Sequence, residues 1–228
     1  MRTPPGRRTF EELRGRALER YRDGEARLPG EDDTDGRQRQ LTRLGNAANA
    51  AALCSLMLGD GDDARAWFDR AAGRWRESFE GAPPDSWGRP IGALKARLLA
   101  GDQAGAEEEA RWALELGAAQ AESPIGLYAG ALALLVLGRY EEARHLGTLL
   151  HDHDADFPED VADALRMIAA GDDLIGYIEA VESVLDSFET REAYLEDVPV
   201  ADTVLVLQAL AARRDLRAEL ESPLLPPK

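Results

Sequence analysis

The sequence predicts an all-α protein built of stacked antiparallel helix hairpins, and three observations carry this prediction. An apolar stretch that ends in glycine, followed by a short turn and an Ala-rich segment, occurs four times. Ala and Leu dominate the chain from residue 41 onward, and no segment of convincing length alternates with the period of a β-strand. Helical hairpins of this kind bury their apolar faces only against neighbouring hairpins. The four junctions are Leu58-Gly59-Asp60, Ala100-Gly101-Asp102, Leu137-Gly138-Arg139 and Ala170-Gly171-Asp172.

The N-terminal region, residues 1–40, is predicted to hold one amphipathic helix and an acidic linker. Phe10, Leu13, Ala17 and Tyr21 recur at helical spacing, which predicts a helix over residues 8–23 that ends near Gly24. Residues 24–36 contain proline, glycine and a run of acidic side chains, a composition typical of an exposed linker.

Residues 41–228 are predicted to form the helical-repeat domain. Ser123-Pro124 has the pattern of an N-cap followed by proline at the first helical position. Pro158 precedes two acidic residues, which are favourable in a first helical turn. Residues 79–88, with Pro83-Pro84, are predicted to be a long connection. The predicted helices are 41–58, 62–78, 90–100, 104–117, 124–137, 140–150, 158–170, 173–188 and 199–214.

Two of these segments are apolar on nearly every side, which is typical of helices covered by neighbours on more than one face. The first, residues 127–137, is expected at the centre of the stack. The second, residues 200–212, is expected to pack on the stack as a C-terminal helix, inside its concavity or at a subunit contact. About four hairpins, an N-terminal helix and this C-terminal helix make up the predicted fold.

The charge and composition limit the classes of partner. With 43 acidic and 27 basic residues, the formal net charge of −16 would repel a nucleic-acid backbone. The longest apolar run, 127–137, is shorter than the roughly 20 residues that span a bilayer. The single cysteine, Cys54, excludes an internal disulfide and fits a reducing compartment. We therefore expect a cytoplasmic protein that binds neither nucleic acid nor membrane.

The residues around the junctions resemble tetratricopeptide repeats, a family of helix-turn-helix units of about 34 residues. The first copy has Gly59, Ala64, Phe68 and Ala71 at the family's spacing. The other copies follow the pattern with substitutions, over residues 41 to 188 in all. These copies are Gly101-Ala106-Ala110-Ala113, Gly138-Ala143-Gly147 and Gly171-Gly176-Ala180.

The resemblance implies a concave groove lined by the first helix of each hairpin and a role in binding proteins without chemistry. Such a groove would be unusually apolar here, with one cation, so we expect another protein, the chain's own terminal helices or a second copy in a homodimer to fill it. The groove residues implied in this way are Asn46, Asn49, Leu53, Met57, Ile91, Lys95, Leu98, Tyr128 and Leu132.

Residues near the C-terminus have a second resemblance. Val198-Pro199 before an apolar helix, followed by Arg213-Arg214 and Ser222-Pro223, is similar to the tails of some all-helical bacterial toxin-immunity proteins. This resemblance implies an alternative function, in which an acidic surface neutralises a basic toxin. The negative charge would raise the rate of association with such a partner.

An enzyme is the third hypothesis, and it depends on the three histidines. His145, His151 and His153 lie within nine residues of one another, interleaved with Asp152, Asp154 and Asp156. His151 and His153 could ligate one metal only in an extended segment, because residues two apart diverge by about 200° on a helix. We prefer a polar helix end for this segment. We therefore expect no metal, no cofactor and no catalytic residue, and a protein that is not an enzyme.

Overall fold

The computed structural model describes residues 5–30, 32–153 and 157–227 and shows an all-α protein. Ten α-helices and two short 3₁₀ turns account for its regular structure, and the described ranges contain no strand. Most helices that follow one another in sequence pack together as antiparallel neighbours, in agreement with the predicted fold class. None of the helices within the described ranges has the length and apolarity needed to span a membrane.

The helices belong to two compact units. The first comprises Met1–Gly101, Arg191–Ala201 and Glu221–Lys228, and the second comprises Asp102–Thr190 and Asp202–Leu220. The chain therefore passes between the units at four points, and the second junction glycine, Gly101, is the last residue before one of them. The predicted division of the chain between residues 40 and 41 stays a prediction.

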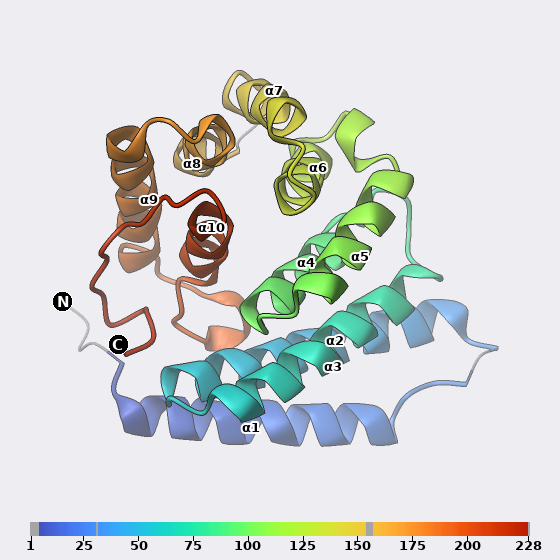
Figure 1. The fold of residues 1–228 in the computed structure, drawn as a ribbon. Helices are drawn as coiled ribbons and strands as arrows, with labels where there is room; N and C mark the ends of the chain where they lie inside the picture. The colour runs from blue at the N-terminus through green and yellow to red at the C-terminus, as the bar shows by residue number, and fades with distance from the viewer. Residues whose placement is uncertain (1–4, 31, 154–156, 228) are drawn as a thin grey trace. The chain divides into compact units, whose positions relative to one another are not determined.

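The first unit contains α1 (Arg7–Ala26), α2 (Thr34–Met57), α3 (Gly61–Phe79) and α4 (Gly88–Leu99), each packed on the next (Figure 1). Tyr21 of α1 meets Trp67 of α3 edge to face, with 5.1 Å between the ring centroids. Arg74 of α3 donates a hydrogen bond to the same tyrosine hydroxyl at 3.1 Å. These aromatic and polar contacts fix the predicted N-terminal helix against α3.

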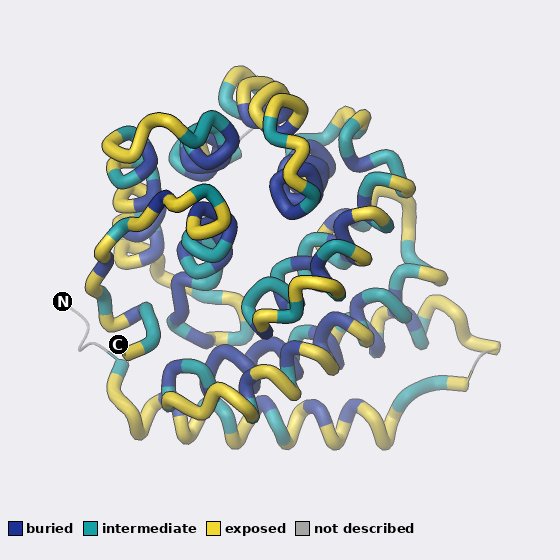
Figure 2. Tube along the Cα trace, in the orientation of Figure 1, coloured by how far each residue is buried: buried dark blue, intermediate teal, exposed yellow. Residues whose placement is uncertain are grey.

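The second unit contains α5 (Gln103–Glu115), α6 (Pro124–Val136), α7 (Tyr140–His151), α8 (Glu159–Ala170) and α9 (Leu174–Glu189), again packed in chain order. Its last helix, α10 (Asp202–Ala212), packs against α8 and α9. Figure 2 shows that α6 is buried along almost its whole length, as its uniformly apolar sequence predicts.

All four junction glycines adopt the left-handed backbone conformation that favours glycine, with φ between 70° and 79°. After Gly59, the Asp60 amide returns to the Ser55 carbonyl at 2.9 Å, and the Asp60 carboxylate accepts the Asp63 amide at 3.2 Å. One residue thus closes α2 and caps α3. At the fourth junction two residues share these roles: the Gly171 amide returns to the Met167 carbonyl at 2.9 Å, and the Asp173 carboxylate accepts the Gly176 amide at 2.8 Å.

The predicted helix at 41–58 is wrong at its start, because α2 begins at Thr34, inside the predicted linker. The acidic run supplies an N-cap: the Asp33 carboxylate accepts the Gly36 amide at 2.9 Å. Gly24 does not end α1 but lies on its buried face, where a Cβ would come within 2.8 Å of Leu44. The described residues that connect α1 to α2 are therefore only 27–30 and 32–33. Glu31 lies outside the described residues.

The predicted C-terminal helix is also shorter than expected, since α10 covers Asp202–Ala212 instead of 199–214. Beyond its end, Arg214 donates hydrogen bonds to the carbonyls of Ala169 and Ala170 at 3.1 and 3.2 Å. Its guanidinium also lies 3.9 Å from the ring centroid of Tyr140. Arg214 therefore satisfies carbonyls at the C-terminus of α8, where a cation is favourable.

The repeat-like spacing describes the first helical pairs better than the last. Ala64, Phe68 and Ala71 are buried on α3, and Ala106, Ala110 and Ala113 are buried on α5. On α9, the corresponding positions 176, 180 and 183 are not buried. The buried face of α9 is displaced by one residue and consists of Tyr177, Val181, Val184, Leu185 and Phe188. The fourth junction thus precedes a helix rotated relative to the repeat pattern.

Gly130 of α6 lies against the backbone of the short 3₁₀ turn Ala118–Gln120, and this contact gives a stability prediction. A Cβ at this position would lie 3.0 Å from backbone atoms of Ala118 and Ala119, which cannot rotate away. We expect Gly130→Ala to lower the free energy of unfolding by about 1–3 kcal/mol, as overpacked positions do. The measurement is urea unfolding of the full chain.

Gly73→Ala is the matched control, because Gly73 lies within α3 and a Cβ there would meet nothing within 4 Å. This substitution should stabilise the protein by up to about 1 kcal/mol through helix propensity alone. Equal effects of the two alanines would contradict the proposed close approach at Gly130.

Candidate functional site

The nine predicted groove residues are divided between the two units. Five of them are buried: Asn49, Leu53, Met57, Tyr128 and Leu132. The other four, Asn46, Ile91, Lys95 and Leu98, are partly exposed. Seven belong to α2 and α4 of the first unit, whereas Tyr128 and Leu132 belong to α6 of the second. Their assembly into one binding groove stays a prediction.

Trp75 fills the space beside the predicted groove residue Asn46. The indole Nε1 of Trp75 donates to Asn46 Oδ1 at 3.1 Å. A Cβ at Gly45 of α2 or at Gly92 of α4 would come within 2.7 or 2.8 Å of the same indole ring. Two glycines on different helices therefore admit one large side chain, which joins α2, α3 and α4.

His151 and His153 lie beside different groups. His151, the last residue of α7, places Nδ1 3.2 Å from Asp163 Oδ1 on α8. His153 Nε2 lies instead 3.3 Å from the carbonyl oxygen of Glu122. Asp154 and Asp156, part of the same predicted cluster, lie outside the described residues. Within the ranges that the structure describes, no group of three His, Cys, Asp or Glu side chains could hold a metal ion.

Cys54 is buried in the wall of α2. Burial raises the pKa of its thiol to about 12, against a smaller opposing effect of Arg14 and Arg20. A nucleophilic cysteine needs a depressed pKa and access to a substrate. The environment of Cys54 is that of a small packing residue.

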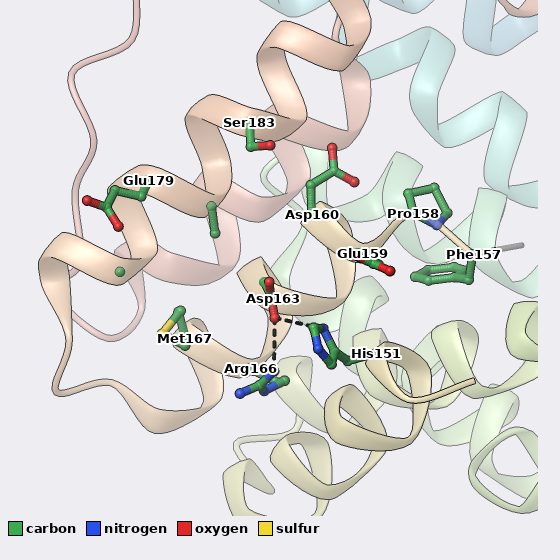
Figure 3. A pocket seen from close by; sticks show the side chains of 12 residues that line it. His151, Phe157, Pro158, Glu159, Asp160, Asp163, Arg166, Met167, Glu179 and Ser183 are labelled. Carbon is green, nitrogen blue, oxygen red and sulfur yellow. Dashed lines mark hydrogen bonds and ion pairs between the residues drawn. The ribbon is translucent and has the colours of Figure 1, made fainter. Parts of the chain in front are cut away.

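An open pocket of about 890 Å³ lies between α8 and α9, at the end of α7, and it is the candidate functional site of the second unit (Figure 3). We call it the α8–α9 pocket. The open positions of α9 described above, Gly176, Ala180 and Ser183, form one wall. It is completed by His151, Phe157, Pro158, Glu159, Asp160, Asp163, Arg166, Met167 and Glu179.

Four carboxylates line the α8–α9 pocket, and one of them is neutralised by an ion pair. Asp163 forms an ion pair with Arg166 at 2.9 Å and faces His151 on its other side (Figure 3). Asp160 accepts the amide of Val161 at 2.9 Å, within the first turn of α8. Glu159 and Glu179 are exposed and form no ion pair within the described chain. The pocket therefore carries an excess of negative charge.

Sequence reasoning considered His151 as a metal ligand but did not predict this pocket. The available signal was the fourth repeat copy, in which Gly176 and Ala180 stand where the pattern calls for Ala and a large side chain. Small side chains at these positions leave space between α8 and α9. Predicting that space required knowing that the buried face of α9 is displaced by one residue.

These observations define an all-α protein of sequentially packed helices with an open, acidic pocket in its second unit. No family model matches the sequence, and neither the curated proteins nor the solved structures contain a significant match.

Proposed function

We propose that the chain is a non-catalytic helical scaffold that binds another protein. The observation that supports this proposal is the packing of α1 to α4 and of α5 to α9 in chain order, each helix against the next. Proteins assembled in this way present extended surfaces and often use them for recognition. The resemblance to tetratricopeptide repeats favours the same function.

The partly exposed face of α4 is the part of the predicted groove that a partner could contact. Ile91, Lys95 and Leu98 follow one another at positions i, i+4 and i+7, so they lie on one side of the helix. Two apolar side chains beside a cation suit a partner segment of mixed character. This face of α4 is therefore the surface that we expect the partner to contact.

The net charge favours one kind of partner, and so supports the immunity-like alternative as a second candidate. A chain with 43 acidic and 27 basic residues attracts a basic protein over distances of about 10 Å at 0.1 M salt. A basic toxin would be one such partner. In both candidates the chain binds a protein and performs no reaction.

The test is capture followed by reconstitution. The immobilised chain is exposed to a lysate of its own organism at about 50 mM salt, and each retained protein is then purified separately. We expect one of them to form a stoichiometric complex by light scattering. A basic partner released at about 0.5 M salt, where the Debye length is about 4 Å, would favour the second candidate. Failure of every purified candidate to bind would overturn the proposal.

A pair of neighbouring leucines on α4 tests whether the partner binds at the predicted groove. Leu98 and Leu99 are both partly exposed, but only Leu98 belongs to the predicted groove. We expect Leu98→Ser to weaken the reconstituted complex about tenfold, corresponding to about 1.4 kcal/mol, and Leu99→Ser to have little effect. Far-UV circular dichroism of both variants checks that the helices are retained. Equal affinities of the two variants would contradict the assignment of this face.

A further inference from the structure

We propose that the α8–α9 pocket receives an arginine or lysine side chain from a basic segment of the protein partner. This inference rests on the proposed function, since it names the partner's chemistry and the place where it docks. It is carried by the shape of the pocket, its apolar surface and its uncompensated charge.

The shape of the pocket comes from the rotated face of α9. Gly176 and Ala180 contribute almost no side-chain volume, so space remains between this helix and α8. A Cβ at Gly176 would lie 3.0 Å from Met167 Sδ, so the thioether lies directly beside the glycine in the pocket lining. The space is about 890 Å³, within the range of pockets that receive a ligand.

Apolar groups line part of this space and continue beyond it. Phe157 and Met167 lie in the lining, and Phe157 is held by Tyr128 with 5.6 Å between the ring centroids. Leu174 and Ile175, the residues just before Gly176, are 45% and 70% exposed. Long basic side chains pack their methylene groups on such surfaces while the charged end reaches polar groups. Aliphatic neighbours in the partner segment could cover Ile175.

The charge of the lining selects a cation. Arg166 is engaged by Asp163, which leaves Glu159 and Glu179 without an ion pair in the described chain. They lie on α8 and α9, on opposite sides of the pocket, and Asp160 adds a third carboxylate at the start of α8 (Figure 3). A guanidinium or ammonium group in the pocket would be attracted by this excess of carboxylates, whereas an anion would be repelled.

The other described pockets lack this combination. In the pocket beside α2 and α3, Glu77 already pairs with Arg37 at 2.7 Å and with Arg74 at 3.0 Å. In the pocket beside α6 and α7, Glu142 pairs with Arg139. Each of these smaller pockets, of about 500 and 400 Å³, therefore keeps one carboxylate without an ion pair in the described chain, Glu80 in the first and Glu141 in the second.

The chain offers a direct probe, because its methionines are Met1, Met57 and Met167. Met167 lines the α8–α9 pocket, whereas Met57 is buried at the end of α2 in the first unit. We would label the full chain with [methyl-¹³C]methionine, assign the pocket resonance with Met167→Leu, and add a hexa-arginine peptide at about 50 mM salt. We expect the Met167 methyl resonance to shift and that of Met57 to stay in place.

Charge variants test the carboxylates. Glu159→Gln combined with Glu179→Gln should weaken peptide binding about fivefold, as the loss of two exposed ion pairs would. The matched control combines Glu19→Gln with Glu182→Gln, which removes the same charge from exposed positions outside the pocket. Equal weakening in both variants, or a Met57 shift as large as that of Met167, would overturn the proposal and indicate general surface attraction.

The same variants separate this inference from the proposed function. If a purified partner binds the wild type and the Glu159/Glu179 variant equally and leaves the Met167 resonance in place, the pocket assignment is wrong and the scaffold function stands. If hexa-arginine shifts Met167 but no purified protein binds the chain, the pocket binds cations and the scaffold function fails.

Discussion

Replacing Phe68 with alanine is expected to lower the free energy of unfolding of the first unit by about 3–5 kcal/mol. Phe68 lies in the middle of α3, among the largest fully buried side chains of the described protein. Its neighbours on the same face are Ala64 and Ala71, which are too small to close a cavity left by the ring. Such a loss is a large fraction of the stability of a typical domain.

Urea unfolding followed by tryptophan fluorescence measures this effect, because Trp67, Trp75 and Trp87 all belong to the first unit. Phe79→Ala is the matched control: Phe79 ends the same helix and is only partly buried. Phe79→Ala should lower the free energy of unfolding by about half as much as Phe68→Ala, or less. A loss at Phe79 equal to that at Phe68 would mean that the ring of Phe68 does not anchor α3.

The helix boundaries that the sequence predicts best are those with explicit chemical signals. Ser123 caps α6 by accepting the Gly126 amide at 3.2 Å, with Pro124 in the first turn, as predicted. The junction glycines end helices because a left-handed residue interrupts the helical hydrogen bonds. At three of the four junctions an aspartate, Asp60, Asp102 or Asp173, then caps the next helix. These signals are local, so a single sequence contains them.

The prediction failed where tertiary contacts override composition. The segment after Gly30 has the acidic character of a linker, yet α2 begins within it. Arg37 pairs with Glu77 of α3 at 2.7 Å, and Gln38 is buried. These partners lie 40 or more residues away or depend on how α2 packs, and no local pattern reveals them.

The candidate site was inaccessible to sequence reasoning for a related reason. Ala180 stands nine residues after Gly171, where the repeat pattern calls for a large side chain that packs against the next hairpin. In α9, however, the larger Tyr177 and Val181 occupy the buried face. Burying the larger apolar area is more favourable by roughly 25 cal/mol per Å², so the helix turns its small residues outward. The open pocket follows from that rotation.

Two buried acidic groups predict a loss of stability in alkali. Burial raises the pKa of Cys54 from its ordinary 9.0 to about 12, and that of Tyr177 from 10.0 to about 12. Both groups are neutral in the folded chain below these values, whereas the unfolded chain ionises at the ordinary ones. The folded state therefore binds more protons between pH 9 and 12, and its stability falls as the pH rises through that window.

The expected loss by pH 11, relative to pH 8, is about 3 kcal/mol through Cys54 and about 1 kcal/mol through Tyr177. Cys54 belongs to the first unit and Tyr177 to the second, so each variant should alter the unfolding of its own unit. Urea unfolding at both pH values, under reducing conditions, should show a shallower decline for Cys54→Ala and for Tyr177→Phe. Tyr177→Phe should also be at least as stable as the wild type at neutral pH, because its buried hydroxyl has no hydrogen-bond partner in the described chain. An unchanged alkaline decline in both variants would show that neither side chain is shielded from solvent as the structure places it.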